Sequence, residues 1–153
     1  MVKNSQYLAL IGCYRNYLTK YSGITEEMLE DVTTTLEDVQ TDLRELLPPD
    51  SILVGQSLNF DLIALKMFHP YVIDTSVCFN ITGNRRWKTG LSKLTEMFLN
   101  KTIQNHGSDG HHPVEDAGAA MALVNLKLEK GLKFGDAVLG GEVDTELLLV
   151  ELS

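Results

Sequence analysis

Residues 51–65 read SILVGQSLNFDLIAL, and this stretch decides the fold class. The run from Ser51 to Val54 is short, aliphatic and β-branched, which predicts a buried strand. Gly55 predicts a turn, and the apolar positions around Leu62 predict a helix. A strand, a tight turn and a helix in this order are typical of an α/β fold.

The rest of the chain repeats this alternation. Residues 71–75 (YVIDT) form a second buried-strand pattern. Helices are expected at Thr25, from Thr33 or Thr34 to Pro48, around Leu91 to Phe98, and from Pro113 to a C-cap at Gly131. Short buried strands between amphipathic helices imply a mixed, mostly parallel sheet flanked by helices.

The bulk composition limits the classes of protein to consider. A chain of 153 residues suits one compact domain, and 44% hydrophobic residues are enough for a core. The formal net charge of −8 argues against a broad basic face that would hold nucleic acid by counterion release. An active site that binds only one strand end is still compatible with this charge.

Cysteine usage and hydropathy predict a soluble, intracellular protein. Cys13 and Cys78 lie far apart and without the spacing of metal ligands, so we expect core thiols in a reducing compartment. No segment approaches the roughly 18 consecutive apolar residues that a membrane helix needs.

The first candidate for chemistry is Asp61. The acid stands at the start of a predicted helix, just beyond the carboxyl end of a predicted strand, where open α/β sheets bind their ligands. Alternatively, Asp61 only stabilises the positive end of the helix dipole.

The second candidate is the sequence GHHPVEDA, residues 110–117. A glycine turn presents His111 and His112 just before Asp116, which lies in the opening turn of a helix. A carboxylate here can bind a hard divalent cation, and a nearby imidazole can deprotonate a water molecule. The alternative is a loop histidine followed by an ordinary N-terminal helix acid.

Together, these two stretches resemble the second and third motifs of the DEDDh 3′→5′ exonucleases, and their surroundings resemble the REX-type RNA exonucleases in particular. The segments that carry the resemblance are residues 17–25 (YLTKYSGIT), 47–50 (LPPD), 54–58 (VGQSL), 65–70 (LKMFHP), 72–76 (VIDTS), 110–111 (GH) and 115–117 (EDA). They extend over roughly Tyr17 to Gly131. The resemblance implies an RNase H-like fold.

It also implies a set of site residues. Members of the family carry an Asp-x-Glu on the first strand, an Asp in the second motif, and a His followed five residues later by an Asp in the third. Asp61 and Asp116 would then be metal ligands, His111 the general base, and His112 a flanking residue. Two Mg²⁺ or Mn²⁺ ions, the 3′ ends of single-stranded RNA as substrate, and a nuclear or nucleolar location follow from the same resemblance.

A basic and aromatic stretch, residues 85–88, is a further candidate. Arg85, Arg86 and Lys88 are suited to contact a phosphate backbone, and Trp87 is suited to stack on a base. The alternative is a basic loop or sheet edge with no ligand.

The chain departs from the family pattern at its N-terminus. Met1 to Arg15 contains no Asp or Glu, so the first motif is absent and the N-terminal strands are expected to be truncated. We therefore expect a divergent segment (residues 1–16), a partial exonuclease domain (17–131) and a C-terminal tail (132–153). Gln56 stands where the family usually has His, which is expected to alter a contact behind the site.

Asp144 and Glu146 have Asp-x-Glu spacing, and both side chains would share one face of a strand. They would replace the first motif only if a C-terminal strand entered the sheet, and a surface tail is the simpler expectation.

Two functions remain open at this point. The first is a 3′→5′ exoribonuclease domain with impaired activity, and the second is a non-catalytic pseudo-exonuclease that binds or regulates a partner. In either case an exposed sheet edge would favour homo-oligomers.

Overall fold

The computed structural model describes residues 17–104 and 111–143. Within them, residues 17–32 and His111 form one unit, and residues 33–104 with 112–143 form another. The first unit contains helix α2 (Thr19–Ser22) and the 3₁₀ turn η1 (Glu27–Leu29). The sequence predicted a helix at Thr25, and the turn begins two residues later.

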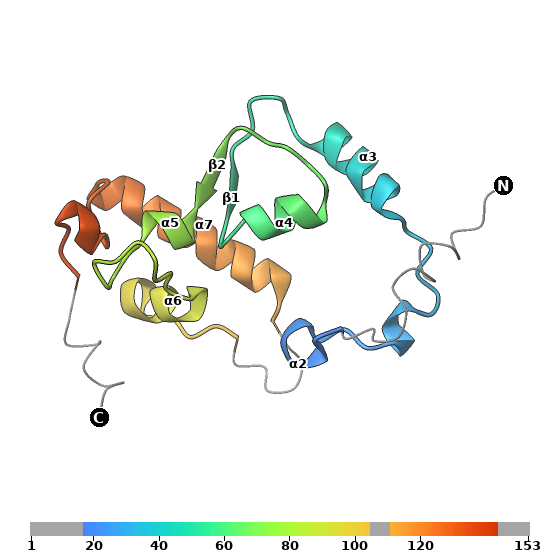
Figure 1. Ribbon diagram of the computed structural model, residues 1–153, viewed down its shortest axis with the longest axis horizontal. Helices are drawn as coiled ribbons and strands as arrows, with labels where there is room; N and C mark the ends of the chain where they lie inside the picture. Colours follow the sequence, from blue (N-terminus) through green and yellow to red (C-terminus); the bar gives the residue numbers. More distant parts are fainter. Residues whose placement is uncertain (1–16, 105–110, 144–153) are drawn as a thin grey trace. The chain divides into compact units, whose positions relative to one another are not determined.

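The second unit is an α/β structure, as predicted (Figure 1). Strand β1 pairs in parallel with β2, with Leu53 opposite Val72 and Gly55 opposite Asp74. In the described part of the chain the sheet has these two strands. The elements are α3 (Leu36–Leu46), β1 (Leu53–Gly55), α4 (Asn59–Ala64), β2 (Val72–Asp74), α5 (Thr75–Cys78), α6 (Leu91–Leu99), α7 (Pro113–Lys130) and the 3₁₀ turn η2 (Ala137–Leu139).

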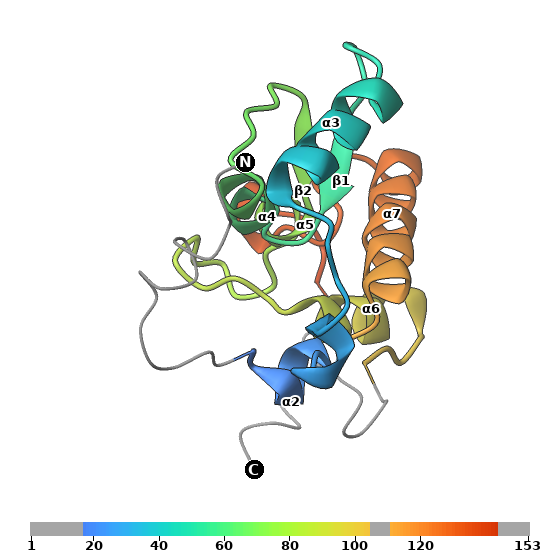
Figure 2. The ribbon, with the colours of Figure 1, turned by 90° about the vertical axis from the view of Figure 1, so that its right-hand side faces the viewer.

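Helices cover both sides of the strand pair. Figure 2 shows α4 on one side of the strands and α7 on the other. Helix α7 packs against β1 and against α6. The predicted helix from Pro113 to Gly131 is confirmed, with Pro113 in its first turn and Gly131 as its C-cap at φ 99°.

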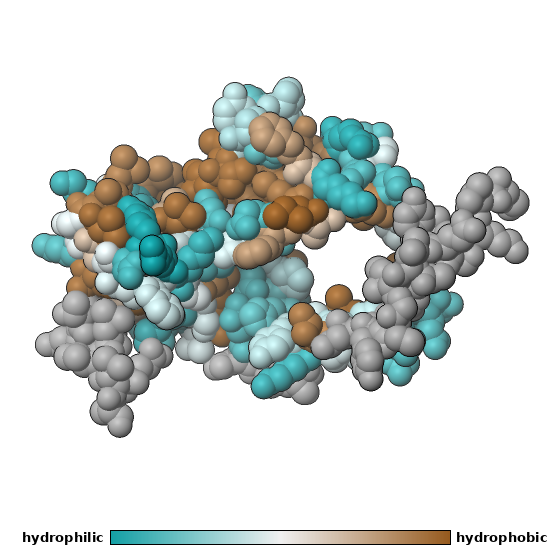
Figure 3. Space-filling view, viewed as in Figure 1, coloured by the Kyte–Doolittle hydropathy of each residue, from teal (hydrophilic) through white to brown (hydrophobic). Residues whose placement is uncertain are grey.

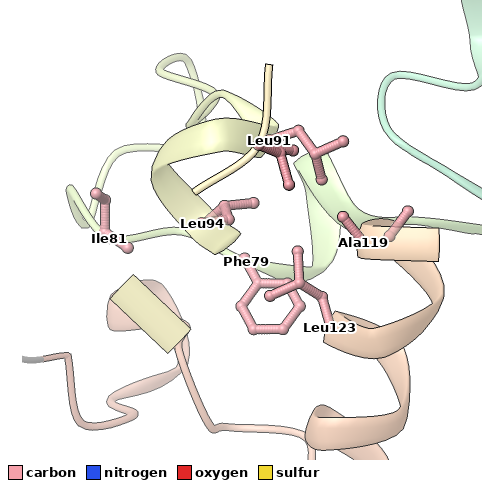
Figure 4. Packing of buried hydrophobic residues seen from close by; sticks show 8 residues of the cluster. Phe79, Ile81, Leu91, Leu94, Ala119 and Leu123 are labelled. Atoms are coloured by element: carbon pink, nitrogen blue, oxygen red, sulfur yellow. The ribbon is translucent and has the colours of Figure 1, made fainter. Parts of the chain in front are cut away.

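The core lies between α5, α6 and α7 (Figure 4). Phe79, Leu94 and Leu123 are fully buried at its centre. Cys78 is partly buried and packs against this cluster, whereas Cys13 lies outside the described residues. Helix α5 was not predicted, because its four residues are too few to show a helical period.

Residues 132–143, which the sequence assigned to a C-terminal tail of residues 132–153, are part of the second unit. The rings of Phe134 and Phe98 are in contact at a tilt of 59° with centres 5.3 Å apart, and Asp136 is 1% exposed. Asn80 forms a parallel bridge with Asp136. The sequence did not predict this packing because Asp136 and Gly135 bond residues more than forty positions away, Arg85 and Asn80.

Among the helices of residues 17–104 and 111–143, none combines the length and apolar character needed to cross a membrane.

Candidate active site

Asp61 is presented by a turn at the carboxyl end of β1. Ser57 adopts a left-handed backbone conformation with φ 56°, which turns the chain from the strand into α4. Asp61 lies in the first turn of α4 and its side chain is exposed. The carboxylate therefore lies at the edge of the sheet where the sequence placed it.

Asp74 holds this turn in place. Its Oδ1 accepts hydrogen bonds from the backbone N–H of Ser57 at 2.8 Å and of Ser76 at 2.9 Å. One carboxylate thus links the turn before α4 to the start of α5. Sequence analysis did not single out Asp74 as a positioning residue, although an Asp directly before a helix is a common N-cap signal.

Gln56 is a second link behind the turn. Its Nε2 donates to the carbonyl of Thr89 at 2.9 Å, and its Oε1 accepts from Thr75 Oγ1 at 2.6 Å. Thr75 is fully buried and its hydroxyl also lies 3.0 Å from the Gly55 carbonyl. Gln56, which stands where the resemblance expects histidine, therefore links the end of β1 to Thr75 and to Thr89.

Asp116 lies in the first turn of α7 and is partly buried. Its Oδ1 accepts a hydrogen bond from Gln104 Nε2 at 2.9 Å. Glu115 Oε2 accepts a hydrogen bond from the backbone N–H of Gln104 at 3.1 Å. Gln104 has φ 65°, so the segment after α6 turns sharply to meet α7. Nothing in the sequence pattern pointed to Gln104.

The two histidines belong to different units. His111 is exposed, belongs to the unit of residues 17–32, and its backbone N–H donates to the Tyr21 carbonyl at 2.7 Å. His112 belongs to the second unit and is the N-cap residue of α7. Its carbonyl accepts a hydrogen bond from the backbone N–H of Asp116 at 3.0 Å.

Within the basic stretch, Arg85 has a structural partner. Its guanidinium bonds Asp136 at 3.0 Å and the Val77 carbonyl at 3.1 Å. Arg86, Trp87 and Lys88 are exposed, Trp87 at 69%. Arg85 therefore helps to hold residues 131–143.

The sequence of the chain also matches a known family. Residues 14–124 match the model of the Exonuclease family, RNase_T. The chain belongs to this exonuclease family. The site described above therefore lies on an exonuclease domain, and the resemblance that the sequence motifs indicated is confirmed.

Similar proteins include RNA exonucleases of animals and fungi. RNA exonuclease 5 of Rattus norvegicus is 51% identical over 118 residues, which are 77% of this chain and 15% of the relative. RNA exonuclease 1 of Saccharomyces cerevisiae is 42% identical over 138 residues, which are 90% of this chain and 24% of the relative. The exonuclease-family chain thus spans between about a seventh and a quarter of these relatives.

A solved structure supports the fold. The Neurospora crassa Pan2 catalytic unit, which contains a protease and a nuclease domain, aligns with a TM-score of 0.63 and 28% sequence identity. The alignment covers 74% of this chain and 19% of the other. This chain therefore has the α/β fold of an exonuclease domain.

The exonuclease family generally uses divalent metal ions, so the donor set must be tested for fit. In the part of the chain that the structure describes, no three His, Cys, Asp or Glu side chains gather as a group that could hold a metal ion. Mg²⁺ and Mn²⁺ prefer several oxygen ligands. Asp61 and Asp116 alone do not provide this coordination, so the described residues do not fit a complete two-metal site.

Proposed function

We propose that this chain is part of a 3′→5′ exoribonuclease domain that binds the 3′ ends of single-stranded RNA. The observation that carries the proposal is the family match together with the placement of Asp61 and Asp116. Both acids lie in the first turns of the helices α4 and α7, at the positions that match the acids of the family's second and third motifs. Relatives in animals and yeast are named RNA exonucleases, which supports RNA over DNA.

In this proposal Asp61 and Asp116 are the carboxylates that the second and third motifs contribute to the reaction. Hydrogen bonding from Gln104 fixes the rotamer of Asp116. His111 is proposed as the general base because it precedes Asp116 by five residues, the spacing of the third motif. Arg86, Trp87 and Lys88 are proposed to contact the RNA backbone and a base.

We further propose that hydrolysis by this chain alone is weak. Its single Asp-x-Glu sequence is Asp144 to Glu146, which lies outside the described residues. Without a second pair of carboxylates, two divalent ions lack the oxygen ligands that they prefer. The proposed role in this chain is therefore substrate binding first and turnover second.

The experiment is a hydrolysis assay with purified chain, 3′-labelled single-stranded RNA, and Mg²⁺ or Mn²⁺. We expect slow release of mononucleotides, if any is measurable, and loss of that release in Asp116→Ala and in EDTA. Rapid release that Asp116→Ala abolishes would overturn the proposed impairment. A second variant, Asp144→Asn with Glu146→Gln, then identifies whether these two residues supply the missing carboxylates.

A non-catalytic pseudo-exonuclease is the second candidate. The observation that favours it is the lack of a three-ligand group among residues 17–104 and 111–143. RNA binding without any metal-dependent release in the same assay would support this candidate. Circular dichroism of the same sample must show the helices, so that a lack of release does not reflect unfolding.

Two further statements belong to the proposal. A nuclear or nucleolar location is proposed from the resemblance to the REX-type enzymes. Self-association is proposed through the sheet. In the described residues β1 and β2 pair only with each other, so each strand has an unpaired outer edge, and such an edge is a template for another strand.

A further inference from the structure

A cavity of about 420 Å³ lies between α3 and the segment that follows α4. Gln40 and Arg44 of α3 line one wall, and Lys66, Phe68 and His69 line the other. In Figure 1 this segment leads from α4 to β2. Gln40 Nε2 donates to the Leu65 carbonyl at 2.6 Å and so ties the two walls together. All of these residues belong to the second unit.

The charge of the cavity is opposite to that of the chain. The whole sequence has 21 acidic and 13 basic residues, yet the lining contains Arg44 and Lys66 and no Asp or Glu. Among the described residues neither cation forms a salt bridge. Two cations without neutralising carboxylates in one cavity favour an anionic ligand.

The cavity also exposes an aromatic ring. Phe68 is 88% exposed, more than any other large hydrophobic residue in the described chain. Its neighbour His69 is fixed, because its Nε2 lies 2.8 Å from the Ser51 carbonyl and its ring meets Tyr71 edge-on. An exposed ring beside two cations is the combination with which proteins bind single-stranded nucleic acid, through base stacking and phosphate contacts.

The backbone at Lys66 is consistent with a role for its side chain. Lys66 has φ 48°, in the left-handed region that favours glycine and costs other residues energy. A glycine there would be less strained but would remove one of the two cations that line the cavity.

The cavity lies within reach of the proposed active site. Asp61 is in the first turn of α4 and Lys66 lies just beyond the end of that helix. From Asp61 to the last residue of α4, Ala64, the helical rise amounts to about 4.5 Å along the axis. Phe60 and Ile63 of α4 are 66% and 70% exposed, and Figure 3 shows hydrophobic surface over α4. A few nucleotides of an extended strand can therefore span from Asp61 to the cavity.

We propose that this cavity binds the RNA strand upstream of its 3′ end. One base stacks on Phe68, and phosphates contact Arg44 and Lys66. The inference rests on the proposed function, since a strand that ends at Asp61 is what brings RNA to α4. It extends that function from the strand end to the nucleotides that precede it.

The test is equilibrium binding of a 5′-labelled oligouridylate, followed by fluorescence anisotropy in EDTA, so that hydrolysis does not contribute. Phe68→Ala is expected to weaken binding about tenfold, because one stacked base is lost. Arg44→Gln and Lys66→Asn are expected to weaken binding and to flatten the plot of log K against log salt by about 0.7 each. Asparagine is chosen for Lys66 because it tolerates the left-handed conformation.

Lys130→Gln and Leu132→Ala are matched controls, because both residues are exposed and neither lines the cavity. Both should bind RNA as the unmodified chain does. Equal affinity of Phe68→Ala and the unmodified chain, with unchanged circular dichroism, overturns the cavity proposal and leaves the proposed function intact. Displacement of the RNA by an oligoglutamate peptide of higher affinity also overturns it. If the unmodified chain binds no RNA, both proposals fail together.

Discussion

The side chain of Gln56 joins three segments of the second unit. Its amide connects the end of β1 with the buried hydroxyl of Thr75 and with the carbonyl of Thr89, which precedes α6. Both partners are buried, so their hydrogen bonds cannot be replaced freely by water. These two hydrogen bonds therefore hold Gln56 in place, directly before the turn that leads to Asp61.

Replacing Gln56 by alanine is expected to lower the free energy of unfolding by about 1–3 kcal/mol, because two buried groups lose a partner. Gln56→His should lose less, since an imidazole can accept from Thr75 and donate to Thr89. Urea unfolding followed by circular dichroism measures both variants. An alanine variant with the same midpoint as the unmodified chain would contradict this role.

Among the elements, α3 has a complete capping box at its N-terminus. Thr35 Oγ1 accepts from the backbone N–H of Asp38 at 3.2 Å, and Asp38 Oδ2 accepts from the backbone N–H of Thr35 at 2.8 Å. Two hydrogen bonds hold the pKa of Asp38 below its ordinary value. The larger effect comes from the backbone N–H of Thr35 and the smaller one from the Thr35 hydroxyl. Because α3 forms one wall of the cavity, its start also sets the position of Arg44.

This pKa shift predicts how the stability of α3 depends on pH. A carboxylate whose pKa is lower in the folded chain stabilises it above the unfolded pKa of about 3.9, and this contribution is lost as the pH falls through the folded pKa. Asp38→Asn should therefore be less stable than the unmodified chain at neutral pH, and the difference should shrink in acid. Urea titrations at several pH values test this. A difference that grows as the pH falls would show that the sign is wrong.

At the scale of the whole molecule, a buried polar cluster closes the second unit around residues 131–143. Lys127 is 7% exposed and donates to the carbonyls of Cys78 at 2.6 Å and Phe134 at 2.7 Å. Its Nζ lies 4.6 Å from the centre of the Phe79 ring. Burial lowers the pKa of Lys127, and nearby Asp136 opposes this shift. The cluster holds the segment after α7 against the core.

Lys127→Met is expected to destabilise the second unit by about 1–3 kcal/mol, because two carbonyls lose a charged donor. The segment after α7 should then detach more often, so that trypsin cleaves after Lys133 faster. Lys130→Met, an exposed residue on the same helix, is the control and should behave as the unmodified chain. Equal rates of cleavage in Lys127→Met and the control would show that the cluster does not hold the segment.

The sequence by itself determined the elements whose signals are local. The strand, turn and helix around Gly55, the helix from Pro113 to Gly131, and the α/β class follow from short-range periodicity, caps and turn residues. The resemblance of residues 17–131 to the REX-type exonucleases also needed only the order of short motifs, and the family match confirms it. Asp61 and Asp116 were selected in the same way, as acids in first helical turns.

Only the tertiary structure decided which side chains hold these elements together. Asp74 on the turn before α4, Gln104 on Asp116, and Arg85 on Asp136 are contacts between residues 12 to 51 positions apart. Such pairs leave no periodic signal in the sequence, because their approach depends on how the strands and helices pack. The same holds for the cavity between α3 and Lys66, whose walls come together only when α3 lies beside the end of α4.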